Sequence, residues 1–338
     1  MAKENAVIKL KADLKAGKTE RLYLFYGEED YLKDLYTKKI LSIVPDDSFS
    51  EFNKIIIDGK TADLIEISDA LESFPMMSDK KVILIEDSGI FKKATEAQKD
   101  FYDKAFKNLA DDTILVFSES EVDKRSALFK AASKAGLAVE FKPLSDLELV
   151  SFIIREANSY NLKIQKDCAE YMVEICEHGL LNIKNEIAKL AGYCTEEITK
   201  TDIDQIVSKS LETKVFDLCD VLMEKNADKA LSMIGDLKTT KTSPFQLLYI
   251  LFGSFDKMLR AKLMLENGMS YDEICSVMGL APFIAKKYIN GAKGFSKDEL
   301  KNMVTAVAEI DLSIKQGAIA EWDAFQKYIT DFFKGDEL

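Results

Sequence analysis

The residues of this chain best placed for phosphate chemistry follow its first strongly apolar run, which ends at Gly27. In phosphate-loop proteins a strand runs into G-x-x-x-x-G-K-[ST], whose backbone N–H groups wrap the phosphates while the lysine reaches the β and γ positions. Here residues 28–30 are all acidic, no second glycine stands in register, and Lys33 and Lys38 fall within a helical pattern. Three carboxylates would repel a triphosphate but suit the positive end of a helix. The sequence therefore predicts neither binding nor hydrolysis of a nucleotide.

An acidic pair, Glu86-Asp87, closes a later apolar run. Such a pair after a strand is one part of the magnesium site in phosphate-loop enzymes, but it functions only together with the phosphate loop. Because that loop is missing, we interpret the pair as the solvated end of a strand.

Metal and nucleophile chemistry has few candidates. His178 is the only histidine, and the five cysteines include no C-x-x-C pair. A zinc site from Cys168, Cys176, His178 and Cys194 matches no familiar ligand spacing, so buried free thiols are the preferred interpretation. G-x-S-x-G, H-E-x-x-H and G-x-G-x-x-G are absent from the sequence. We predict no catalytic residue, no metal site and no cofactor.

The elements that would position these residues alternate over the first 143 residues. Several apolar runs are near-continuous in Ile, Val and Leu, which is typical of parallel strands buried on both faces. Helical patterns separate them, which predicts an α/β domain with a mostly parallel sheet. The expected strands are 21–27, 52–59, 81–87, 113–120 and 137–141, and the expected helices are 30–44, 61–73, 93–110 and 124–136.

After Pro143 the strand signal stops and the pattern becomes helical. Three capping-box starts, a serine followed by a glutamate three residues later, stand at Ser145, Ser270 and Ser296. A long helix is predicted from Ser243-Pro244 to Gly268. We expect an α/β domain at 1–143, a small helical domain at 144–211 and a second helical domain at 212–338.

The composition restricts the class of protein. With 338 residues, 47% of them hydrophobic and 31% charged, the chain is predicted to fold into two or three domains. A net charge of −12 argues against a nucleic-acid-binding surface over the whole molecule. The most apolar run, 247–255, is half the length of a membrane span, and no apolar signal segment is found at the N-terminus. We expect a cytoplasmic protein that does not contact a membrane.

The stretch DALESFPMMSDKKVILIED, residues 69–87, is unusual because apolar residues stand beside a polar break. A helical pattern ends in Phe74-Pro75-Met76-Met77, residues 78–81 are Ser-Asp-Lys-Lys, and a strand pattern follows. Apolar side chains at the end of an element are either part of the core or available to a partner. The residues alone favour the core interpretation.

Several segments together resemble the delta subunits of bacterial DNA polymerase III, which are components of the sliding-clamp loader. The resemblance spans essentially the whole chain, and its order and spacing are more specific than any one motif. The segments that carry it are LYLFYGEEDYLKD, ALESFPMMSDKKVILIED, VDKRSALFKAASKAGLAVEF, LLNIKNEIAKLAGY and EIDLSIKQG.

The resemblance implies a degenerate AAA+-like domain with a RecA-type parallel sheet, a small helical lid and a helical collar. It implies no ATP binding and no intrinsic enzymatic activity. It also implies a collar that joins the tau/gamma and delta prime subunits, and an apolar wedge that enters a pocket of the beta sliding clamp. That contact helps to open the clamp for loading onto primed DNA, and DNA is contacted only within the complex.

The wedge of this family corresponds to Phe74, Pro75, Met76 and Met77. Met76 and Met77 stand where the family usually has a Leu/Phe pair, and Phe74 matches a further apolar contact position. The Met-Met pair departs from this family pattern. Methionine is a flexible and polarizable filler of pockets and lacks an aromatic ring. A weaker clamp affinity than that of aromatic relatives is therefore expected.

Two other functions remain open from the sequence. Residues 270–293 resemble a helix-turn-helix, with Gly279-Leu280 at the turn and Lys286-Lys287 on the second helix, although the basic stripe expected for DNA reading is missing. An active P-loop-type nucleoside triphosphatase with an unusual loop is the other alternative, and the acidic residues 28–30 argue against it.

Overall fold

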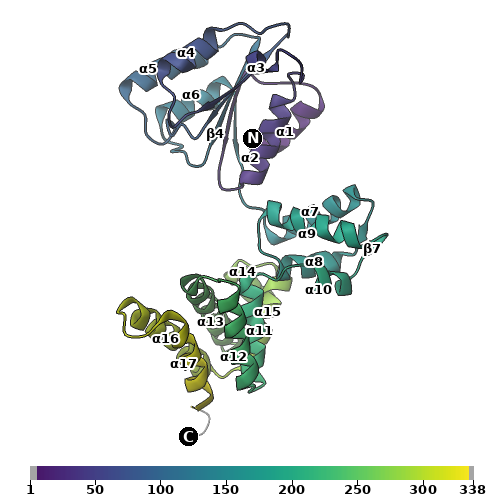
Figure 1. The fold of residues 1–338 in the computed structure, drawn as a ribbon, viewed down its shortest axis with the longest axis vertical. Coiled ribbons are helices and arrows are strands. Elements are labelled where there is room, and N and C mark those ends of the chain that lie inside the picture. Colours follow the sequence, from purple (N-terminus) through teal and green to yellow (C-terminus); the bar gives the residue numbers. More distant parts are fainter. Residues whose placement is uncertain (1–5, 335–338) are drawn as a thin grey trace. The chain divides into compact units, whose positions relative to one another are not determined.

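The computed structural model describes residues 6–334, and at residue 334 it describes the backbone alone (Figure 1). The chain divides into two compact units, unit 1 at residues 1–143 and unit 2 at 144–338. A further division of unit 2 at residue 211 stays a prediction.

Unit 1 alternates helices and strands, as predicted. Its first helix, α1, was not predicted, because it buries only Leu10 and its apolar periodicity is weak. Phe52 lies in the short helix α3 and not in the following strand. The strands are β1 (Leu22–Tyr26), β2 (Lys54–Asp58), β3 (Lys81–Glu86), β4 (Thr113–Glu119) and β5 (Leu137–Glu140), and the helices are α1 (Ala6–Lys15), α2 (Asp30–Leu41), α3 (Ser50–Asn53), α4 (Leu64–Glu72), α5 (Glu96–Lys107) and α6 (Ala127–Ala135).

The five strands form one parallel sheet in the order β2-β3-β4-β1-β5. All of β1 and the first five residues of β3 and β4 are buried, which accounts for their near-continuous apolar sequences. Helices α1 and α2 pack on one face of the sheet, and α4, α5 and α6 cover the other (Figure 1). The predicted AAA+-like parallel sheet is confirmed.

Unit 2 is helical apart from one pair of two-residue strands that was not predicted. The strands are β6 (Lys163–Ile164) and β7 (Glu197–Ile198), which pair in parallel. The helices are α7 (Asp146–Ser159), α8 (Lys166–Ile175), α9 (Leu180–Tyr193), α10 (Lys200–Ile206), α11 (Leu211–Met223), α12 (Ala227–Thr239), α13 (Pro244–Glu266), α14 (Tyr271–Met278), α15 (Pro282–Gly294), α16 (Lys297–Lys315) and α17 (Glu321–Lys334).

The three predicted capping boxes of unit 2 are confirmed. The backbone N–H groups of Ser145, Ser270 and Ser296 donate to the glutamate three residues later, at 2.9, 2.8 and 2.6 Å. Each pair satisfies a backbone group at a helix start that has no partner within the helix.

Gly27 has a structural reason to be glycine. Its φ is +114°, and a Cβ atom built on it would lie 2.3 Å from the carbonyl oxygen of Phe141, beyond the end of β5. That carbonyl also accepts the N–H of Glu29 at 3.1 Å. The turn after β1 therefore lies directly against the end of β5, where a side chain has no room.

A lysine from β3 closes the last turn of α4. Lys81 is 0% exposed, and its Nζ donates to Ala70 O at 2.7 Å, Leu71 O at 3.0 Å, Ser73 Oγ at 3.0 Å and also Ser73 O. The last carbonyl groups of a helix lack intrahelical partners and attract a cation. Burial lowers the pKa of Lys81 below its usual value, and the charge of Asp112 opposes this. Lys81 thereby ties the end of α4 to the start of β3.

Gly27→Ala is expected to lower the free energy of unfolding by about 2–4 kcal/mol, because the methyl group meets the Phe141 carbonyl at an unfavourable φ. Urea denaturation followed by circular dichroism measures this. The matched control is Gly192→Ala on α9, where an added Cβ meets nothing within 4 Å. That change is expected to be neutral or stabilising by up to about 1 kcal/mol. Equal effects of the two substitutions would contradict the close-approach explanation.

Lys81→Met is expected to cost about 2–4 kcal/mol of unfolding free energy, because it leaves carbonyl groups at the end of α4 without a donor. The neighbouring Lys80→Met serves as the control. Lys80 makes a single side-chain bond, to Thr19 Oγ1 at 2.7 Å, and its loss should cost less than about 1 kcal/mol. If urea denaturation finds the two variants equally stable, Lys81 does not anchor α4.

Candidate partner-binding site

The predicted wedge residues lie in the loop between α4 and β3. Asp63 caps the start of α4, because its side chain accepts the N–H groups of Ile65 and Glu66. The helix buries Ile67 and Ala70 against the sheet. Ser73 adopts an extended conformation at its end. A proline at position 75 disfavours the helical conformation of the residue before it, so the chain leaves the helix at this point.

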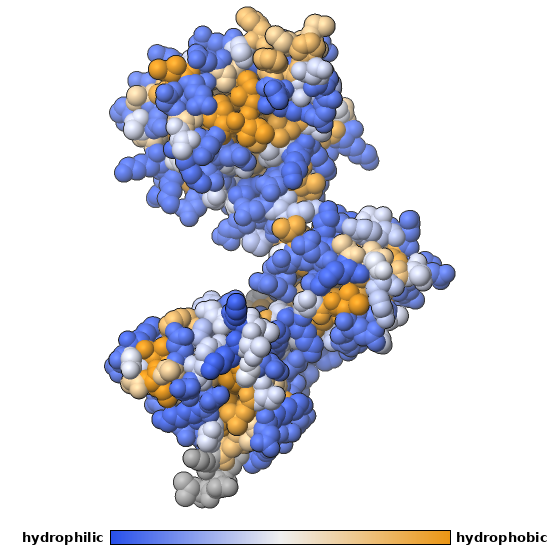
Figure 2. Space-filling model, in the orientation of Figure 1, coloured by the Kyte–Doolittle hydropathy of each residue, from blue (hydrophilic) through white to orange (hydrophobic). Residues whose placement is uncertain are grey.

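The side chains of this loop are not core residues. Phe74 is 85% exposed, Met77 is 82% exposed and Met76 is 43% exposed, while Pro75 is half-buried. The core interpretation, which the residues alone favoured, is therefore wrong. Figure 2 shows apolar surface on unit 1, over the region where Figure 1 labels α3, α4 and α5. We refer to Phe74, Pro75, Met76 and Met77 as the apolar loop.

The apolar loop stands between two hollows of the surface. Phe74 lines a groove of about 710 Å³ between α4 and α5, together with Leu71 and Phe101. Met77 lines a second groove of about 720 Å³, together with Leu14 and Ile43. The site thus combines projecting apolar side chains with recesses on both sides, a shape suited to contact with another macromolecule.

The backbone of the loop is held by polar contacts. The carboxamide of Asn53 bonds both backbone groups of Met76: Nδ2 donates to Met76 O, and Met76 N donates to Oδ1, each at 2.7 Å. Ser78 Oγ donates to Lys80 O at 3.0 Å in the polar turn that follows. Sequence reasoning did not identify Asn53, because 23 residues separate it from its partner. Sequence reasoning also did not identify Lys81 as a buried anchor. The signal that could have found it is a charged residue at the start of a buried apolar run.

The opposite edge of the sheet holds an acidic recess of about 550 Å³. It lies at the C-terminal ends of β2, β3 and β4, where open parallel sheets commonly bind ligands. Its titratable side chains are five carboxylates and two lysines, and its lining residues are Asp30, Lys33, Asp34, Asp58, Lys60, Glu86, Asp87, Ser118 and Ser120.

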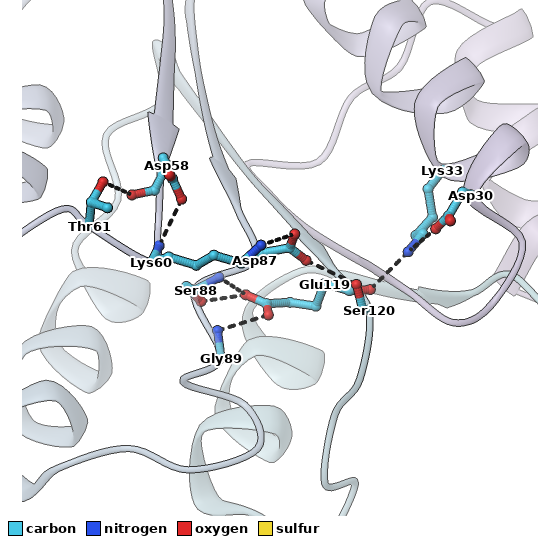
Figure 3. Close-up of polar contacts among 10 residues, drawn as sticks. All are labelled: Asp30, Lys33, Asp58, Lys60, Thr61, Asp87, Ser88, Gly89, Glu119 and Ser120. Carbon is cyan, nitrogen blue, oxygen red and sulfur yellow. Dashed lines mark hydrogen bonds and ion pairs between the residues drawn. The ribbon is translucent and has the colours of Figure 1, made fainter.

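Both lysines of the acidic recess are paired with carboxylates (Figure 3). Lys33 Nζ lies 2.8 Å from Asp30 Oδ1, and Lys60 Nζ lies 2.9 Å from Asp87 Oδ2. The hydrogen bond from Lys60 lowers the pKa of Asp87, which Ser120 Oγ also contacts at 3.0 Å. The charges of this recess therefore disfavour a phosphate group.

Behind the acidic recess, the buried carboxylate of Glu119 supports the turn after β3. It accepts Ser88 N at 3.1 Å, Gly89 N at 3.0 Å and the Ser88 hydroxyl (Figure 3). Burial raises the pKa of Glu119, and these hydrogen bonds oppose the shift. Because its oxygens are occupied by the turn, Glu119 has a structural role here.

The alternative sites are less well supported. Lys287, which the helix-turn-helix interpretation places on the DNA-reading helix, lies mostly buried 4.3 Å from the centroid of the Phe216 ring and 4.0 Å from Glu174. Burial lowers its pKa. For the zinc site that the ligand spacing disfavoured, no group of three or more Asp, Glu, His or Cys within residues 6–334 could hold a metal ion. In the same described range, no helix is both long and apolar enough to cross a membrane.

Comparisons with known proteins agree along almost the whole chain. The family "DNA polymerase III, delta subunit" matches residues 23–142, and the family "DNA polymerase III delta subunit, C-terminal domain" matches 212–332. DNA polymerase III subunit delta of Bacillus subtilis is 25% identical over 333 residues and covers 96% of each chain. The probable delta subunit of Aquifex aeolicus is 23% identical, over 86% of this chain and 85% of its own.

A solved structure shares the fold. The Bacillus subtilis DNA clamp loader delta protein superposes with a TM-score of 0.60 at 24% identity, over 97% of this chain and 99% of its own. The two family matches, in the expected order, cover both the α/β unit and the C-terminal helices. This chain belongs to the family of DNA polymerase III delta subunits.

Proposed function

We propose that this chain binds the beta sliding clamp through the apolar loop and helps to open it for loading onto primed DNA. The observation that carries the proposal is the exposure of Phe74, Met76 and Met77 on a loop whose backbone is held in place. Exposed apolar side chains that cluster beside recesses are typical of protein contact sites. Family membership supports the clamp as the partner.

The expected strength of the contact is modest. Burying two methionine side chains contributes about 1.5–3 kcal/mol each, and the loss of translational and rotational freedom on association offsets much of this. Unit 2 would therefore supply most of the assembly energy of the loader. We assign residues 144–211 to the lid and 212–338 to the collar, which joins the tau/gamma and delta prime subunits in the cytoplasm.

An exposed aromatic row in unit 2 supports the collar assignment. Phe245, Tyr249 and Phe252 are spaced four and three residues apart on α13, so they share one face of the helix, and all three are exposed. The other face of α13 lies in the core through Leu247, Leu251 and Phe255. A neighbouring loader subunit is the proposed occupant of the aromatic row.

The proposed subunit has no intrinsic enzymatic activity and binds no ATP. The support for this lies in the acidic recess, whose lysines are both engaged by carboxylates, and in the missing phosphate loop. DNA would be contacted only within the assembled loader.

Met76→Ala/Met77→Ala is expected to weaken binding to the beta clamp of the same organism by about 100-fold, because the buried contact area is lost. Surface plasmon resonance with the full chain measures the affinity. Since both side chains are exposed, the free energy of unfolding should stay within about 0.5 kcal/mol of the wild-type value. Ile65→Ala is the matched control, because Ile65 is an exposed apolar residue on α4 outside the loop. Wild-type affinity in the double variant, or no binding by wild type, would defeat the proposal.

Equilibrium dialysis with labelled ATP and Mg²⁺ is expected to show no stoichiometric binding at millimolar nucleotide. The physical reason is the charge of the acidic recess together with the absence of a backbone cradle. Saturable binding of one ATP per chain would contradict the assignment and favour the alternative of an active nucleoside triphosphatase.

A further inference from the structure

The apolar loop needs a support other than its own side chains. Phe74 and Met77 project into solvent, so their packing contributes little to holding the backbone. A loop with free apolar side chains samples many conformations unless its backbone groups are bonded, and each ordered residue then costs conformational entropy on binding.

Asn53 provides this support from a rigid position. It is the last residue of α3, which packs against β2 and β3, and its side chain is 1% exposed. Its carboxamide gives one donor and one acceptor to Met76, each at 2.7 Å. A buried amide that satisfies both backbone groups of one residue fixes that residue in position and orientation.

The residue after this contact has a strained backbone. Met77 has a φ of +53°, a left-handed conformation that is unfavourable for a non-glycine residue. Such conformations persist where the surrounding structure holds them. The two bonds to Met76 hold the peptide immediately before Met77, and they thereby set the direction in which the Met77 side chain leaves the surface.

We infer that Asn53 is a positioning residue for the clamp contact: it touches no partner itself but preorganises Met76 and Met77 for binding. This inference rests on the proposed function. Without the carboxamide, the Met76 N–H and C=O groups are left to water, the loop relaxes from its strained conformation, and the clamp must order it on binding. The affinity for the clamp falls although every contacting side chain is still present.

The test compares the clamp affinity of wild type with that of Asn53→Ala in the full chain, by surface plasmon resonance at 25 °C. Loss of two supporting hydrogen bonds is expected to weaken binding by about tenfold. Amide hydrogen exchange on the free chain should show faster exchange at Met76, since its N–H donates to Asn53.

The matched control separates positioning from stability. Ser126 caps α6 in the same unit, where its Oγ accepts the N–H of Phe129 at 3.1 Å. Ser126→Ala should lower the melting temperature by about as much as Asn53→Ala does. It should leave the clamp affinity unchanged, because the chain is still folded at 25 °C. A merely structural Asn53 would behave like Ser126.

Asn53→Asp keeps the size of the side chain and is the second variant if Asn53→Ala does not fold. At neutral pH its carboxylate can accept from Met76 N but faces Met76 O without a donor. Protonation restores an O–H donor, and burial at this position is expected to raise the pKa of a carboxyl group above its ordinary value. The affinity relative to wild type at the same pH should therefore recover as the pH falls from about 7.5 to about 5.

The outcomes are distinct. Weaker binding by Asn53→Ala or Asn53→Asp, with Ser126→Ala unaffected, supports the positioning role. Wild-type affinity in the Asn53 variants overturns that role and leaves clamp binding standing. No clamp binding by wild type overturns the proposed function and this inference with it.

Discussion

A buried ammonium group determines how unit 1 presents its candidate site. Lys81 stands at the start of β3 with no exposed surface, so its charge requires acceptors within the fold. The carbonyl groups at the end of α4 provide them. Lys81 thereby joins the end of the helix to the start of the strand, and the eight residues between them belong to neither element. They form a surface loop, and the apolar side chains of that loop face solvent.

The two ends of the parallel strands differ in chemistry. At the C-terminal ends of the strands, where parallel sheets usually hold ligands, carboxylates outnumber lysines and engage them. At the N-terminal edge, the chain enters β3 from the apolar loop. The same buried sheet thus supports an edge that disfavours phosphate and an edge suited to a protein partner. Gly27, in the turn after β1 at the first of these edges, leaves room for the close approach of Phe141.

Local patterns predicted much of this architecture. The near-continuous apolar runs indicated parallel strands, since strands covered on both faces need apolar side chains at successive positions. The serine-glutamate pairs at Ser145, Ser270 and Ser296 marked helix starts through contacts only three residues apart. The pattern failed at α1, which buries a single residue, and at β6 and β7, which are too short to show a period. The residues alone favoured the core for Phe74 and Met77, because exposure is not encoded in residue type; only the family resemblance indicated a contact surface.

The sequence by itself determined the parallel α/β unit, the helical remainder, the missing phosphate loop and the position of the apolar loop, because each is expressed in residues close together along the chain. Only the tertiary structure decided that the loop is exposed and how it is held. Asn53 meets Met76 across 23 residues, and Lys81 reaches back to α4 across eight to eleven. Such contacts depend on where the sheet brings separate segments together, and no local pattern of residues specifies that placement.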